Sequence, residues 1–190
     1  VFPRSSMLSP FFSYERKTFT VWMKSLVCHG NGCTVYDSSG EIVYRVENYG
    51  HKSSKEVYLM DLQGRVLVTL QRKPLIMILQ RWYGFKCNGD IINKKKPWFE
   101  VKKCFRICMG RLICQVTVGF NKYRVVKLDQ KAAFRIIDVD GDIVAEVKQK
   151  QSSQGIMLGN DVLTLIVEPN IDHSLVMAIV TVYGLMNHKM

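Results

Sequence analysis

An uncharged apolar run near the C-terminal end of the sequence constrains the fold more than any other feature. From Ser174 to Met186 no residue is charged, and the apolar residues favour no single side of a helix. A helix that is apolar all round must be buried in protein or in lipid. The run is well short of the roughly 20 apolar residues of a membrane-spanning helix and longer than a usual strand of about 3–10 residues. We therefore predict a helix over 171–186, capped by Asp172 and enclosed by the rest of the chain.

The preceding chain repeats one hairpin pattern three times. In residues 35–43, 59–67 and 136–144, two apolar runs flank an Asp that is followed three residues later by Gly. The Asp side chain can accept bonds from the backbone ahead of it, and Gly supplies the positive φ of a tight turn. Short apolar runs continue from Thr18, and a coarse count gives twelve strands. The sequence therefore predicts an antiparallel meander, as a barrel or sandwich, and a closed barrel would enclose the apolar helix.

Composition and cysteine usage indicate one intracellular domain. The chain has 190 residues, 47% of them hydrophobic, which suits a single globular domain with its own core. We expect a flexible arm over residues 1–17 and one domain over residues 18–187. The six cysteines form no C-x-x-C pair, and neither a secretory signal nor a glycosylation sequon is visible. We expect reduced thiols, no transmembrane segment, a monomer, and a location in the cytoplasm or nucleus or peripherally at the plasma membrane.

The positive charge is concentrated in the middle third of the chain. Net charge is +11, and residues 72–127 hold 14 Lys and Arg against two acidic residues. Such a field attracts the phosphates of lipid head groups or of nucleic acid, although a solvated basic face that only aids solubility carries at least equal weight. The candidate anion-binding residues are Lys94, Lys95, Lys96, Lys102, Lys103, Arg106, Lys122 and Arg124.

No motif in the sequence supports an enzymatic reaction, a cofactor or a metal. Residues 138–142 are rich in Asp, but an EF-hand loop needs Gly at its sixth position and Glu at its twelfth, whereas Gly141 is fourth and the twelfth residue is Gln149. Cys28, His29 and Cys33 flank a hairpin turn and lack the four convergent ligands of a zinc site. Phosphate-binding glycine loops and nucleophile elbows are absent. We therefore expect a non-enzymatic protein.

Several segments of the sequence form one recognisable pattern: Thr20–Leu26, Gly32–Asp37, Gly40–Tyr49, Glu56–Asp61 with Gly64–Leu67, Arg81–Trp82 and the closing apolar run. Together they resemble the plant LURP-one-related family. The resemblance covers about residues 18–186. It implies a mainly β fold, a twelve-stranded antiparallel closed barrel enclosing a C-terminal hydrophobic helix, similar to the tubby C-terminal domain and to phospholipid scramblases. It places Leu175, Val176, Ala178, Ile179, Val182 and Tyr183 in the core helix.

The resemblance implies no catalytic activity and no defined ligand. Members of the family are associated with plant responses to pathogens, and tubby domains bind phosphoinositides through basic residues whose positions cannot be transferred to this sequence. We expect a binding or adaptor domain for anionic, phosphoinositide-like lipid head groups in defence-related signalling. The alternatives are a nucleic-acid-binding or transcription-associated regulator, and a protein-interaction domain without a lipid ligand. Stacking on nucleic acid would need Trp82, Tyr83, Trp98 or Phe99, which on strands are usually core residues.

Overall fold

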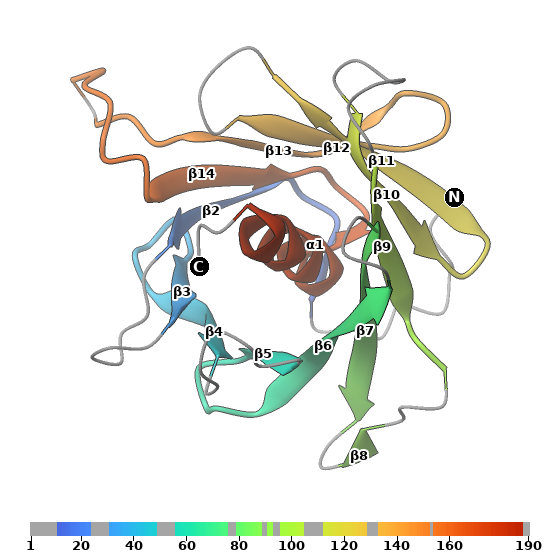
Figure 1. The fold of residues 1–190 in the computed structure, drawn as a ribbon. Coiled ribbons are helices and arrows are strands. Elements are labelled where there is room, and N and C mark those ends of the chain that lie inside the picture. Colours follow the sequence, from blue (N-terminus) through green and yellow to red (C-terminus); the bar gives the residue numbers. More distant parts are fainter. Residues whose placement is uncertain are drawn as a thin grey trace.

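The computed structural model describes residues 11–23, 31–48, 56–75, 79–88, 91–92, 96–104, 112–128, 133–152 and 154–187. Within these ranges the chain forms short and long strands followed by one helix (Figure 1). The elements are β1 (Phe12–Ser13), β2 (Lys17–Trp22), β3 (Asn31–Tyr36), β4 (Ile42–Asn48), β5 (Glu56–Met60), β6 (Val66–Leu75), β7 (Leu79–Asn88), β8 (Ile91–Ile92), β9 (Phe99–Lys103), β10 (Leu112–Val118), β11 (Asn121–Lys127), β12 (Phe134–Ile137), β13 (Ile143–Gln149), β14 (Val162–Val167), β15 (Ile171–Asp172) and α1 (His173–Met186).

The long strands close into a barrel. Their order around the wall is β6-β5-β4-β3-β2-β14-β13-β12-β11-β10-β9-β7, and β7 pairs with β6 to complete the ring. Every pairing in the ring is antiparallel. β8 pairs only with β7, and β1 pairs with β15 outside the ring. The predicted closed barrel of twelve strands is confirmed.

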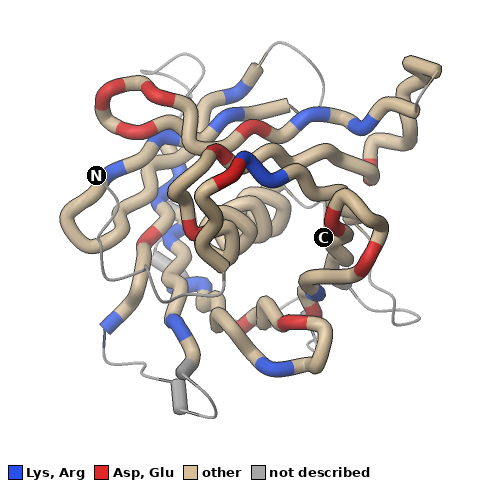
Figure 2. The backbone as a smooth tube through the Cα atoms, turned by 180° about the vertical axis from the view of Figure 1, so that it is seen from behind, with Lys and Arg blue, Asp and Glu red and all other residues tan. Residues whose placement is uncertain are grey.

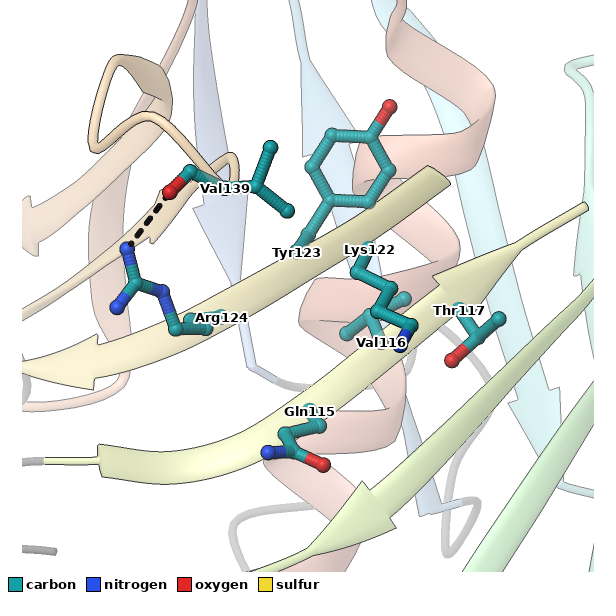
Figure 3. A pocket seen from close by; sticks show the side chains of 7 residues that line it. All are labelled: Gln115, Val116, Thr117, Lys122, Tyr123, Arg124 and Val139. Carbon is teal, nitrogen blue, oxygen red and sulfur yellow. Dashed lines mark hydrogen bonds between the residues drawn. The ribbon is translucent and has the colours of Figure 1, made fainter. Parts of the chain in front are cut away.

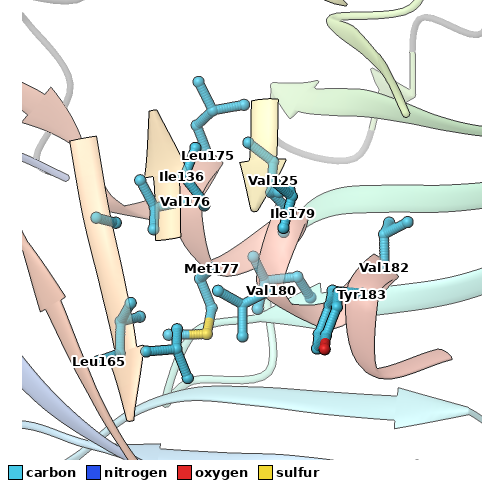
Figure 4. Packing of buried hydrophobic residues seen from close by; sticks show 14 of the residues in the cluster. Val125, Ile136, Leu165, Leu175, Val176, Met177, Ile179, Val180, Val182 and Tyr183 are labelled. Carbon is cyan, nitrogen blue, oxygen red and sulfur yellow. The ribbon is translucent and has the colours of Figure 1, made fainter. Parts of the chain in front are cut away.

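Helix α1 lies inside this ring (Figure 1), and its residues are the centre of the hydrophobic core (Figure 4). The structure buries all six residues assigned to the core helix by the resemblance: Leu175, Val176, Ala178, Ile179, Val182 and Tyr183. Asp172 is the N-cap, because its side chain accepts from the backbone N–H groups of Ser174 and Leu175. Barrel and helix meet closely where the ring of Tyr183 lies 4.0 Å, centroid to centroid, from that of Phe134 on β12. The apolar run is therefore covered by protein on all sides.

The three repeated hairpin turns have the predicted chemistry. Gly40, Gly64 and Gly141 have φ values of 87°, 79° and 95°, in the left-handed region that glycine adopts at little cost. In each turn the Oδ1 atom of the Asp accepts from the backbone N–H four residues ahead, at 3.0, 2.9 and 2.9 Å respectively. The turns join β3 to β4, β5 to β6 and β12 to β13, so antiparallel order places all three at one rim of the barrel, called here the turn rim.

Two segments outside the twelve long strands form backbone pairs of their own. Of the arm expected over residues 1–17, residues 1–10 lie outside the described ranges, but Phe12 and Ser13 pair with Asp172 and Ile171. The described residues of 150–160 form a hairpin that joins β13 to β14. This hairpin marks the opposite end of the barrel, the hairpin rim. In the described ranges no helix is both long and apolar enough to cross a membrane.

Candidate anion-binding surface

The strands of the basic middle third expose their cations to solvent because successive side chains alternate between the inner and the outer face of the barrel wall. On β9, Phe99 and Val101 point into the core, which turns Lys102 outward. On β11, Tyr123 and Val125 are buried and Arg124 is exposed. Side chains on a strand alternate between its two faces, so a strand with an apolar inner face carries its polar residues outside. Lys102 and Arg124 therefore face the same outer side of the wall.

Strand register brings cations from distant parts of the sequence into one line. Gln115 on β10 is the cross-strand partner of both Lys102 and Arg124. On the other side Lys102 is opposite Arg81 of β7, and Arg81 is opposite Lys73 of β6. We call Lys73, Arg81, Lys102, Gln115 and Arg124 the basic row. Adjacent strands lie about 4.8 Å apart, so the row extends roughly 19 Å across five strands.

One carboxylate anchors one part of this surface. Glu100 Oε1 accepts from Arg81 Nη1 at 3.2 Å and from the Tyr83 hydroxyl at 3.4 Å. The ammonium of Lys73 lies 5.2 Å from the centroid of the Tyr83 ring, in cation–π range. These contacts hold Arg81 and Lys73 against the wall and partly offset the charge of Arg81. Among the described residues, neither Lys102 nor Lys122 has an ion-pair partner.

A shallow pocket of about 470 Å³ lies over β10 and β11. It is lined by Gln115, Val116, Thr117, Lys122, Tyr123, Arg124 and Val139 (Figure 3). Lys122 is the cross-strand partner of Thr117, so an ammonium and a hydroxyl are neighbours at this site. Arg124 Nη2 donates to the backbone oxygens of Asp138 and Val139 at 3.3 and 3.4 Å, which fixes the guanidinium beside the turn that joins β12 to β13. This arrangement offers ammonium, amide and hydroxyl donors to an anion such as a phosphate.

The acidic turn at the edge of the pocket limits where an anion can bind. Asp138 is occupied, since its Oδ1 accepts from the backbone N–H groups of Asp140, Gly141 and Asp142. Asp140 and Asp142 are exposed, and Figure 2 shows this loop as a red cluster beyond the blue positions of the neighbouring strands. Negative charge there repels an anion placed next to the turn. The favourable position is therefore above Lys102 and Lys122.

Charge is also distributed unequally between the two rims. The turn rim carries acidic residues in its turns, namely Asp37, Glu41, Asp61, Asp138, Asp140 and Asp142. The strand ends at the hairpin rim carry eight cations against Glu47, Glu56 and Glu146, whereas Lys17 and Arg65 oppose the acids of the turn rim; the eight are Arg72, Lys73, Arg81, Lys102, Lys103, Lys127, Arg135 and Lys148. The barrel is thus polarised along its axis, with the positive end at the hairpin rim.

The structure brings together only some of the predicted anion-binding residues. Lys102 and Arg124 belong to the basic row, with Lys122 in the next cross-strand row. Lys96 is exposed ahead of β9, and Lys103 has the opposite parity and is paired with buried Cys114. Lys94, Lys95 and Arg106 lie outside the described residues. Lys73 and Arg81 were missed: both lie in the basic segment, but only the register of β6 with β7 shows that they join the row.

The aromatic side chains considered for nucleic-acid stacking are buried in the core or already engaged in other contacts. Trp82 and Phe99 are buried in the core. Tyr83 is half-buried with its hydroxyl on Glu100, and Trp98 is half-buried with the ammonium of Lys86 4.8 Å from its ring centroid. Base stacking needs an open ring face.

Two of the four described thiols, Cys33 and Cys114, are unsuited to nucleophilic chemistry. Cys33, Cys87, Cys104 and Cys114 are free. Burial raises the pKa of Cys33 and of Cys114 to about 12, so both are protonated at neutral pH. Within the described ranges no group of three or more His, Cys, Asp or Glu side chains is arranged to hold a metal ion.

The fold and the candidate site define a class of protein: a closed antiparallel barrel that encloses its own helix α1 and has a cationic outer wall. The LURP-one-related family model matches residues 17–184. The chain is 50% identical to Protein LURP-one-related 4 of Arabidopsis thaliana, over 97% of this chain and 85% of that protein. It is 39% identical to Protein LURP-one-related 11 of the same plant, over 94% and 81%. The chain belongs to the LURP-one-related family.

A solved structure has the same fold. The X-ray structure of an Arabidopsis thaliana protein superposes with a TM-score of 0.66 and 17% sequence identity, covering 93% of this chain and 94% of that one. At this identity the likeness concerns the fold alone.

Proposed function

We propose that this protein is a non-enzymatic domain that binds anionic phospholipid head groups, of phosphoinositide type, at a membrane surface. The observation that carries the proposal is the basic row, in which register aligns Lys73, Arg81, Lys102 and Arg124 on one outer wall. A setting in plant defence-related signalling is part of the proposal and rests on the family resemblance.

Three features of the wall support a phosphate ligand. Lys102 and Lys122 are exposed, and neither pairs with a described carboxylate. Gln115 and Thr117 supply neutral donors between them. A Lys or Arg near an anionic membrane contributes about 1 kcal/mol, so a few cations on one wall suffice for measurable binding. The cationic hairpin rim adds long-range attraction in the same direction.

Vesicle co-sedimentation tests the proposal. The double variant Lys102→Gln/Lys122→Gln removes two exposed cations that pair with no described carboxylate, whereas Arg124 is kept because it holds the turn that joins β12 to β13. Loss of about 2 kcal/mol would weaken partitioning onto phosphoinositide vesicles roughly 30-fold. The matched control is Lys17→Gln/Arg65→Gln, which removes the same charge at the turn rim, where β2 and β6 begin, away from the row.

The outcomes separate a specific site from general charge. The proposal expects the control to bind nearly as well as the unmodified protein, and binding to fall with salt. Equal binding to neutral and to phosphoinositide vesicles, or equal losses in the two double variants, would contradict it.

Nucleic acid is the second candidate ligand, because the basic row would attract its phosphates too. The buried or engaged state of Trp82, Phe99 and Tyr83 makes it the weaker one. A gel shift with single-stranded oligonucleotide at increasing salt decides between them: retention of vesicle binding with no shift favours the lipid.

A further inference from the structure

The hairpin that joins β13 to β14 extends the barrel wall outward. It is held by backbone bonds from Lys150 N–H to Val162 O at 2.9 Å and from Ser152 N–H to Ile156 O at 2.8 Å. Gln151 and Met157 form a further antiparallel bridge. Figure 1 shows this segment, in orange, reaching beyond the ring of strands. It is an ordered projection with its own hydrogen bonds.

The returning segment of the hairpin exposes three consecutive apolar side chains. Ile156, Met157 and Leu158 are 62%, 47% and 37% exposed. Because side chains alternate along extended backbone, Ile156 and Leu158 occupy one face and Met157 the other. A protein partner laid against the hairpin would cover one face and leave the other in water. Insertion into the interfacial layer of a membrane surrounds both faces with apolar material.

Charge around the tip suits an anionic surface. From Gln149 to Asn160 the chain contains no acidic residue and one cation, Lys150. The ammonium of Lys150 donates to Thr20 Oγ1 at 2.5 Å, which holds it at the base of the hairpin. Trp22 lies at the same base, its Nε1 donating to Asp161 Oδ2 at 3.3 Å. Tryptophan is enriched at the boundary between acyl chains and water.

The projection and part of the basic row belong to the same end of the barrel, on different parts of the ring. The hairpin leaves the hairpin rim between β13 and β14, while β6 and β9 end and β7 begins elsewhere on that rim. Lys73, Arg81 and Lys102 all lie within three residues of those strand ends. A membrane that meets the hairpin tip therefore approaches the positive end of the barrel, and the acidic turns point away from it.

We propose that the hairpin 150–161 is a membrane anchor, whose Ile156, Met157 and Leu158 insert into the interface of an anionic bilayer. This inference rests on the proposed lipid-binding function and adds a second contact to it. The basic row supplies the salt-sensitive attraction, and the hairpin tip supplies apolar insertion that salt does not screen.

The test combines a triple variant with a depth probe. Ile156→Ser/Met157→Ser/Leu158→Ser is compared with the unmodified protein by co-sedimentation with phosphoinositide vesicles at low and high salt. We expect the triple variant to bind at least about ten-fold more weakly, with the difference persisting at high salt. In Met157→Trp, we expect emission to shift to the blue on vesicles and to be quenched by brominated lipid, after subtraction of the unmodified protein. The exposed positions leave the thermal unfolding midpoint unchanged, which circular dichroism checks.

Each failure has its own signature. Unchanged binding of the triple variant, with an unshifted Met157→Trp spectrum, would overturn the anchor and leave the proposed function standing. If the unmodified protein binds no vesicle, both fall. If it is a dimer by light scattering and the triple variant is a monomer that binds vesicles equally well, the hairpin joins two copies of this chain, and the anchor is overturned.

Discussion

The hydroxyl of Tyr44 lies 2.5 Å from Nδ1 of His173, and this hydrogen bond joins strand β4 of the wall to the first residue of helix α1. Phe11 packs against both rings, with centroids 5.9 Å from each. Burial raises the pKa of the Tyr44 phenol and lowers the pKa of His173, so both groups are uncharged at neutral pH. The wall, the helix start and the segment before β1 therefore meet at one neutral polar contact.

Replacing Tyr44 by Phe should destabilise the fold. The substitution removes the hydroxyl and leaves Nδ1 of His173 without this partner, which costs about 1–2 kcal/mol of the free energy of unfolding. Urea denaturation measures the loss. Tyr14→Phe, at an exposed position, is the control and should leave the midpoint unchanged. Equal midpoints for Tyr44→Phe and the unmodified protein would show that the bond contributes nothing.

His173 should make stability dependent on pH in mildly acidic solution. Desolvation lowers its pKa below the ordinary value of 6.5, against the opposing effect of Asp172. The unfolded chain therefore takes up a proton at a pH where the folded chain does not. His173 therefore has no effect on stability well above pH 6.5, and the free energy of unfolding decreases as the pH falls below 6.5. Urea unfolding across this range should show a smaller slope for His173→Gln, and parallel curves for the two proteins would contradict the prediction.

Substitutions in the core helix should destabilise the protein far more than substitutions at the hairpin tip. Met177 is completely buried on α1, whereas Met157 is 47% exposed. Met177→Ala leaves a cavity between helix and wall and should lower the free energy of unfolding by about 2–5 kcal/mol. The same change at Met157 should stay within about 0.5 kcal/mol. Chemical denaturation of both variants compares them directly, and similar losses would mean that α1 is not the core.

Asp172 should stabilise the start of α1 more as a hydrogen-bond acceptor than through its negative charge. Its Oδ1 accepts from the N–H groups of Ser174 and Leu175 at 2.9 and 3.3 Å, while Lys86 lies 3.8 Å from Oδ2. Asp172→Ala should cost about 0.5–2 kcal/mol, the usual loss for a helix cap. Asp172→Asn retains an acceptor and should cost less. Thermal unfolding ranks the two, and equal losses would assign the larger share to the Lys86 pair, because both variants lack the negative charge.

The candidate site was only partly predictable from sequence. The concentration of cations in residues 72–127 marked the right part of the chain, and Lys102, Lys122 and Arg124 were among the candidates. The strand register of the structure places Lys73 and Arg81 in the same row as Lys102 and Arg124, and it places Lys103 on the other face of β9. A one-residue change of register moves a side chain to the other face, so a list of basic residues does not define a surface.

By itself, the sequence determined an antiparallel meander that encloses an apolar helix, and the family resemblance made that meander a closed barrel. An uncharged run of the length of α1 must be covered, and three Asp-x-x-Gly turns between apolar runs make an antiparallel meander that can cover it. Tertiary structure alone decided which cations share a wall, that the acidic turns gather at one rim, and that Ile156, Met157 and Leu158 project from the other. Hairpin signals are local and depend on neighbouring residues. Register and rim depend on hydrogen bonds between strands far apart in the chain, and these form only when the barrel closes.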